Sequence, residues 1–169
     1  REEIYEQRRQ ILRGEDLTEE IMDMMQDLLD GLLAQYCSQE TYSEEWDIQG
    51  LCEALNRQFS LNPQENSLEF REMGIEALRE ELFKRVQEAY HKKEQEWGPP
   101  LMRQLEKMVM LRVIDTHWKD HLLSMDYLKE GIGLRGYGQK DPLVEYKREG
   151  FDMFSAMMDR ISSDVVSHL

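Results

Sequence analysis

Two histidines, four positions apart, are the residues whose spacing comes nearest to a chemical site. His117 and His121 would lie one turn apart on a helix, where two imidazoles can bind Zn²⁺ if a third ligand and a water complete the site. The zinc signature of this kind carries Glu where Asp120 stands, and the sequence offers no obvious third ligand. We therefore expect no metal, and a small metal-dependent hydrolase is kept only as the weakest alternative. The other interpretation is a polar stripe on a helix whose opposite side carries Trp118 and Leu122.

A glycine-rich run, Gly131-Ile-Gly-Leu-Arg-Gly136, matches the GxGxxG pattern of dinucleotide-binding sites. That chemistry needs a strand before the glycines and a helix directly after them, whereas a helical pattern precedes this run. We interpret it as a flexible connection between two helices. The sequence also lacks a GxxxxGK[ST] phosphate loop and a recognisable nucleophile, so we expect neither a cofactor nor enzyme activity from this chain.

The composition favours helices, because proline is scarce and strong helix formers dominate throughout. The net charge of −14 is uneven: residues 1–97 carry 11 basic and 24 acidic side chains, or −13, and residues 98–169 carry 10 and 11, or −1. This difference predicts an acidic part and a nearly neutral part that is better suited to contact a partner. The overall acidity argues against nucleic acid, which needs a basic surface.

The two cysteines and the first residues of the sequence bear on the cellular compartment and on the extent of the protein. Cys37 and Cys52 lack metal-ligand spacing and follow no secretory signal, which predicts a reducing cytosolic compartment. No apolar run approaches the roughly 20 residues of a membrane-spanning helix. Because the sequence begins with Arg1 inside a helical pattern, we expect it to be a piece of a longer protein.

The acidic part is predicted to hold four helical segments. The first ends near Gly14, and the second follows a capping pattern that starts at Asp16. The third begins after Asp47, a residue type that caps helices. Asn62 and Pro63 close the third segment, and the fourth runs from Ser67 to Trp97. The second segment carries apolar residues at helical spacing: Ile21, Met25, Leu28, Leu32 and Tyr36. Gly98, Pro99 and Pro100 then interrupt the pattern where the charge changes, which predicts a domain boundary.

The second part is predicted to be an antiparallel helical hairpin. A long helix over 101–130 is apolar on more than one side, and a glycine-rich connection over 131–141 leads to a last helix that begins at Pro142. The last helix carries a seam for one partner helix: Phe151, Phe154, Met158, Ile161 and Val165. The apolar first helix predicts either self-association or packing onto the acidic part. A self-standing helical adaptor that binds a partner helix through residues 101–128 is the alternative.

Several motifs resemble one known family. The stretch over 109–149, most specifically Leu134-Arg-Gly-Tyr-Gly-Gln-Lys-Asp-Pro142 and Glu145-Tyr-Lys-Arg-Glu149, is similar to the two-helix finger of the SecA family of bacterial protein-export motors. Glu6-Gln-Arg8 resembles the end of that family's long scaffold helix, and Trp46-Asp-Ile-Gln-Gly-Leu51 resembles its helical wing. The resemblance implies an all-α fold divided into a scaffold-helix end (1–13), a helical wing (14–97) and a two-helix finger (98–169).

The resemblance also implies a function. In that family the finger enters the cytoplasmic mouth of the SecY channel, meets the translocating preprotein and restrains the ATPase of the motor domains. Its tip would correspond to Tyr137, together with Leu134, Arg135, Gln139 and Lys140. The motor domains, with their ATP and Mg²⁺ sites, are missing from this sequence. The expected location is the cytoplasm, peripherally attached to the cell membrane.

Overall fold

The computed structural model describes residues 2–13, 17–38, 42, 45–61, 70, 72–135 and 141–169. Within these residues the chain forms helices and no strand, so the all-α prediction is confirmed. The helices are α1 (Glu2–Leu12), α2 (Thr18–Tyr36), α3 (Ile48–Phe59), α5 (Ile75–Trp97), α6 (Pro99–Arg135) and α7 (Pro142–His168).

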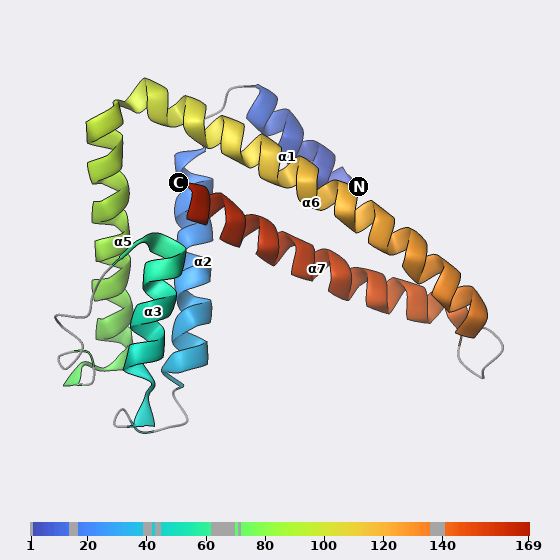
Figure 1. Ribbon diagram of the computed structural model, residues 1–169, viewed down its shortest axis with the longest axis horizontal. Helices are drawn as coiled ribbons and strands as arrows, with labels where there is room; N and C mark the ends of the chain where they lie inside the picture. Colours follow the sequence, from blue (N-terminus) through green and yellow to red (C-terminus); the bar gives the residue numbers. More distant parts are fainter. Residues whose placement is uncertain are drawn as a thin grey trace.

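The helices form a compact group and a projecting pair (Figure 1). Helices α2, α3 and α5 pack together, and we call them the wing. Helices α6 and α7 run antiparallel, point away from the wing and form the hairpin, with α1 lying along the first half of α6. At 1.5 Å per residue, the 37 residues of α6 span about 55 Å. The hairpin is therefore long enough to reach well beyond the wing.

The start of α3 agrees with the sequence prediction, but two neighbouring helix boundaries differ. Asp47 caps α3, since its Oδ1 accepts a hydrogen bond from the Gly50 backbone N–H at 2.9 Å. The helix ends at Phe59, earlier than expected, because Ser60 adopts a left-handed conformation with φ 57°. Helix α2 begins at Thr18, with the buried Leu17 in the cap position and no side-chain cap bond. Asp16, the predicted cap, lies outside the described residues.

The fourth predicted helix is shorter than expected, and the break after it is confirmed. Helix α5 begins at Ile75 rather than Ser67, because the backbone of Gly74 is extended. Gly98 has φ 86°, which glycine tolerates best, and α6 starts immediately at Pro99. The proline needs no backbone partner there, because N–H groups in the first helical turn have none within the helix.

The glycine-rich connection was predicted to begin at Gly131, and this was wrong. Helix α6 continues to Arg135, so Gly131 and Gly133 are helical. Glycine in a helix costs only about 1 kcal/mol relative to alanine. Burial of Ile132, which is 5% exposed, offsets part of that cost.

Two apolar clusters hold the molecule together. The first joins α1, α2, the end of α5, α6 and α7, and the second holds the outer part of the wing. Fully buried members of the first are Ile4, Ile21, Met102, Ile114, Met157 and Val165; those of the second are Leu29, Leu51, Leu55, Leu78 and Leu82. The first cluster crosses residue 98, which confirms the expected packing of the hairpin onto the acidic part. The domain boundary and self-association remain predictions.

Candidate interaction site on the helical hairpin

The seam between α6 and α7 was predicted correctly near its base and wrongly farther out. Ile161 and Val165 are buried as expected, but Phe151 is 69% exposed. The neighbouring Gly150 takes the interface position instead, where an added Cβ would lie 2.9 Å from Met125 Cε. The absence of a side chain thus lets the two helices approach closely. The remaining seam residues are Met157 and Val166, both buried, with Phe154 and Met158 partly buried.

A row of rings crosses the middle of the hairpin from α1 to α7. Tyr5 meets Trp118 with ring centroids 6.5 Å apart, and Trp118 stacks on His121 at 5.5 Å. His121 in turn meets the edge of Phe154 at 5.8 Å. His121 is only 6% exposed, so the interpretation of a polar stripe was wrong for this residue. Burial, and next the charge of Arg160, lower the pKa of His121.

The other histidine of the pair links the two hairpin helices. His117 Nε2 lies 2.5 Å from Asp164 Oδ2 on α7. On the opposite side of α6, Arg8 of α1 binds Asp115 at 2.7 Å. In the part of the chain that the structure describes, no three His, Cys, Asp or Glu side chains are grouped to hold a metal ion. The two histidines therefore join helices.

The predicted tip residues fall at and beyond the end of α6. Leu134 lies in its last turn and is 76% exposed. Arg135 is the last residue of the helix, and its side chain is outside what the structure describes. Tyr137, Gln139 and Lys140 also lie outside the described residues, in the segment that joins α6 to α7.

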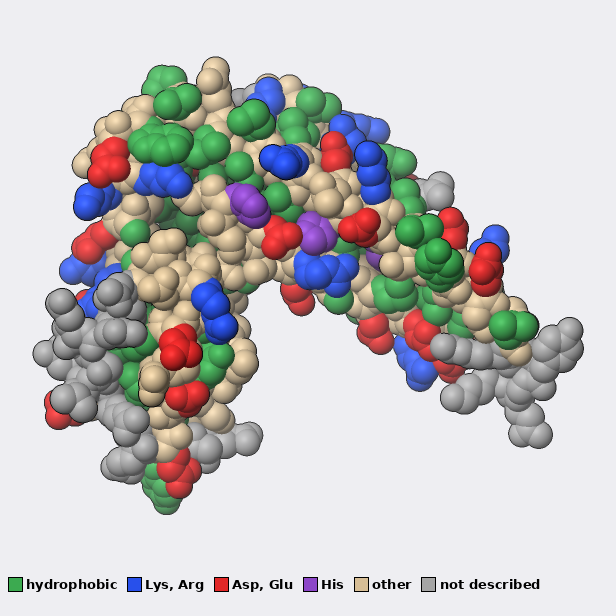
Figure 2. All heavy atoms as spheres, viewed as in Figure 1, with side chains coloured by type: hydrophobic (Ala, Val, Ile, Leu, Met, Phe, Trp, Pro, Cys, Tyr) green, Lys and Arg blue, Asp and Glu red, His purple; other side chains and the backbone are tan. Residues whose placement is uncertain are grey.

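Additional apolar side chains lie exposed along the outer half of the hairpin, and the sequence analysis did not single them out. Leu143 and Val144 are both more than half exposed in the first turn of α7, and Tyr127 is 65% exposed on α6. Figure 2 shows green apolar side chains on this arm, next to its grey end. The available signal was position: Leu143 and Val144 follow Pro142 and lie outside the predicted seam. Together with Leu134, they give the end of the hairpin an apolar character.

The inner part of α6 offers less surface than the adaptor alternative requires. Met102, Met110 and Ile114 are buried within the chain itself, against residues of α1, α2 and α7. Leu101 and Met108 are exposed on the same helix. The apolar face over 101–128 is thus covered in part by this chain's own helices, while Leu122, Leu123 and Tyr127 are exposed.

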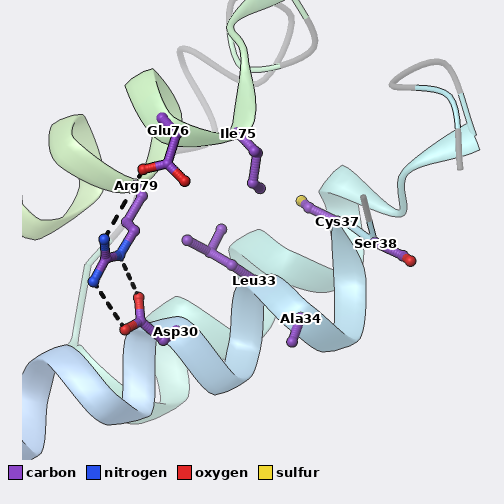
Figure 3. Close-up of a pocket in the computed structure, with 8 residues that line it drawn as sticks. All are labelled: Asp30, Leu33, Ala34, Cys37, Ser38, Ile75, Glu76 and Arg79. Carbon is purple, nitrogen blue, oxygen red and sulfur yellow. Dashed lines mark hydrogen bonds and ion pairs between the residues drawn. The ribbon is translucent and has the colours of Figure 1, made fainter. Parts of the chain in front are cut away.

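A pocket of about 430 Å³ opens between α2 and α5 in the wing (Figure 3). At one side of it, Arg79 binds both carboxylate oxygens of Asp30, with Nε–Oδ1 at 2.6 Å and Nη2–Oδ2 at 3.1 Å. Hydrogen bonding to Asp30 raises the pKa of Arg79. Leu33, Cys37 and Ile75 line the remainder. The charged groups at this pocket bind each other and thereby join α2 to α5, so we assign the pocket no ligand.

The comparison with family models agrees with this architecture. The model described as the SecA Wing and Scaffold domain matches residues 1–169. The chain belongs to this SecA family. Two relatives are named protein translocase subunit SecA and are each 45% identical to the chain. The match covers 98% of the chain for the protein from Syntrophobacter fumaroxidans and 100% for the protein from Desulfotalea psychrophila. Another, from Acidobacterium capsulatum, is also 45% identical over the whole chain.

The matched region is one part of those SecA proteins. The chain spans about a fifth of the length of the relatives, 20% for the first two and 17% for the third. In the described part of this SecA segment, no helix is both long and apolar enough to cross a membrane.

Proposed function

We propose that this chain is the wing and finger segment of an ATP-driven protein-export motor. In this proposal the hairpin is the finger: its end engages a SecY channel and the translocating preprotein, and the helix pair restrains the ATPase of the motor domains. The segment itself binds neither ATP nor Mg²⁺ and catalyses nothing, since those roles belong to the motor domains. It works in the cytoplasm, at the inner face of the cell membrane.

One observation carries the proposal: a long, internally braced hairpin ends in exposed apolar side chains. The seam, the ring row and the His117–Asp164 contact brace the hairpin from its base to its middle, while Leu134, Leu143 and Val144 are exposed at its end. A braced hairpin can transmit movement from a motor at its base to its tip. Apolar contacts are non-directional, so such a tip can engage many polypeptide sequences.

Tyr137 provides the direct test, because the family resemblance places it at the tip. In a full-length SecA that carries this chain as its wing and scaffold segment, we expect Tyr137→Ala to impair preprotein transport strongly and Tyr137→Phe to impair it mildly. An aromatic ring offers contact area without sequence selectivity. Transport into membrane vesicles and the Tm would be measured for each variant.

A matched control is available in the wing. Tyr42 is 77% exposed, so Tyr42→Ala removes an exposed ring of the same kind far from the hairpin. We expect this variant to transport normally. Normal transport by Tyr137→Ala, or equal loss in both alanine variants, would contradict the assigned role of the tip.

A further inference from the structure

A buried polar cluster lies at the bend between the wing and the hairpin. Glu106 of α6 has no exposed surface, and Arg103 precedes it by one turn. Tyr90 of α5 donates its hydroxyl hydrogen to Glu106 Oε1. Arg103 Nη2 donates to the same oxygen at 2.9 Å and to the Tyr90 hydroxyl at 2.7 Å. Burial, and next hydrogen bonding to Glu106, raise the pKa of Tyr90, so its hydroxyl stays protonated at neutral pH.

Arg103 extends this cluster to a third helix. Its Nη2 lies 2.5 Å from Glu94 Oε2 in the last turns of α5, and its Nη1 lies 2.5 Å from the hydroxyl oxygen of Thr18. Thr18 is the first residue of α2. One guanidinium on α6 therefore binds groups on α2 and α5 together. Because the guanidinium is a rigid planar fork, it sets the directions of these bonds as well as their number.

The cluster flanks the place where the chain turns. Tyr90 and Glu94 precede Gly98, and Arg103 and Glu106 follow it. Gly98 alone separates α5 from α6, and glycine permits many backbone conformations. Apolar packing across the bend is non-directional, whereas hydrogen bonds weaken steeply when their angles change. A change in the angle between α5 and α6 would also separate the buried carboxylate of Glu106 from the Tyr90 hydroxyl, and Arg103 from Glu94, which is unfavourable for buried charged groups.

We propose that Thr18, Tyr90, Glu94, Arg103 and Glu106 form a positioning device, the bend cluster, which fixes the angle between the wing and the base of the hairpin. The wing and the hairpin base then turn as one rigid body and do not swing about Gly98. Movement applied to either part reaches the other without being absorbed at the bend. This role is independent of what the hairpin tip binds.

A distance measurement across the bend tests the proposal. Spin labels attached to Glu80→Cys on α5 and Asp126→Cys on α6 would report the angle, since both positions are exposed. The native Cys37 and Cys52 are buried, and burial raises the pKa of both, that of Cys37 to about 11. The label therefore reacts mainly with the introduced cysteines. We expect a single narrow distance distribution for the otherwise unaltered chain.

The decisive variant is Arg103→Met combined with Glu106→Leu. Replacing a buried ion pair by apolar side chains of similar volume often preserves stability, so this variant separates positioning from folding. We expect it to fold and to show a distribution about twofold broader, as for a released hinge. A folded double variant with an unchanged narrow distribution would overturn the proposal, because the other contacts between the two parts, such as the hydrogen bonds of Gln58 on α3 to Ser163 on α7, would then set the angle.

A second variant and a control keep the test decisive if the double variant does not fold. Tyr90→Phe removes one oxygen and keeps the ring, and we expect a smaller broadening; no broadening would overturn the proposal. Asp30→Asn with Arg79→Gln removes an ion pair that also joins α2 to α5, but away from the bend. This control should keep the narrow distribution, and equal broadening would show general loosening instead of a specific role for the bend cluster.

Discussion

At the scale of the residue, His121 should make the stability of the chain depend on pH. Its folded pKa is lower than the ordinary 6.5, so the unfolded chain binds the proton more readily. The stability that neutral His121 contributes is complete above about pH 6.5 and is lost as the pH falls through the folded pKa. We expect His121→Phe, which keeps a ring between Trp118 and Phe154, to lose less stability on acidification than the unaltered chain. Urea unfolding at several pH values would measure this.

The comparison needs a histidine that is not buried. His91 on α5 is exposed, so His91→Phe is the matched variant that removes a histidine from the surface. Parallel stability curves for the unaltered chain and His121→Phe between about pH 7 and pH 5 would show that His121 is not responsible.

At the scale of the element, Asp47 should determine how firmly α3 begins. Its side chain binds the Gly50 N–H, one of the four N–H groups that a helix start leaves without an internal partner. Asp47→Ala should lower the free energy of unfolding by about 1 kcal/mol. Glu53→Ala, on the exposed face of the same helix, is the control and should change it by less than about 0.5 kcal/mol. Equal losses in the two variants would mean that the cap is unimportant.

The seam of the hairpin gives a second prediction at this scale. Met157 is fully buried between the helices, so Met157→Ala should cost about 2–5 kcal/mol of unfolding free energy. Phe151 is mostly exposed, so Phe151→Ala should cost no more than about 0.5 kcal/mol. Denaturant unfolding of both variants would measure these losses. A larger loss for Phe151→Ala than for Met157→Ala would mean that Phe151 lies in the seam, as the sequence pattern predicted.

These elements show which features are readable from sequence. Local chemistry predicted the cap at Asp47, the break at Gly98 and the start of α7 at Pro142, because each depends on one residue and its immediate neighbours in the chain. The end of α6 was missed because tertiary burial of Ile132 offsets part of the low helix propensity of its glycine neighbours, which the local pattern does not reveal. Phe151 was wrongly assigned to the seam because the spacing of apolar residues favours a large side chain there. The close approach of α6 instead requires a residue without a side chain, and Gly150 takes the interface position.

The candidate site was predictable in part for the same reason. Leu134 was expected in the connection between the helices but lies in the last turn of α6, where it is 76% exposed; its role as a contact residue stays a prediction. Exposure of Leu143 and Val144 on α7 depends on how far α6 extends beside them, and the local sequence does not predict this. The joining of α2, α5 and α6 by Arg103 was also beyond the sequence, since Thr18 and Arg103 are 85 positions apart.

At the scale of the whole molecule, stability should decrease along the hairpin towards its end. The two apolar clusters lie in the wing and at the hairpin base. In the described outer part of α6, residues 126–134, only Leu128 and Ile132 are buried. In the outer part of α7, residues 142–156, only Gly150 is buried. Helices with few buried apolar contacts open locally at a lower free energy than the core does.

Hydrogen exchange would show this gradient directly. We expect amides of residues 126–134 and 145–151 to exchange through openings at least about 2 kcal/mol easier than those of residues 106–118 and 157–165. Leu55→Ala in the wing provides the comparison, because it should speed exchange in α3 while leaving the outer hairpin unchanged. If the end of the hairpin binds a channel and a moving polypeptide, as we propose, binding should slow exchange in the outer hairpin first. Uniform protection along α6 and α7 in the free chain would contradict the gradient, and the hairpin would then be equally rigid from base to tip.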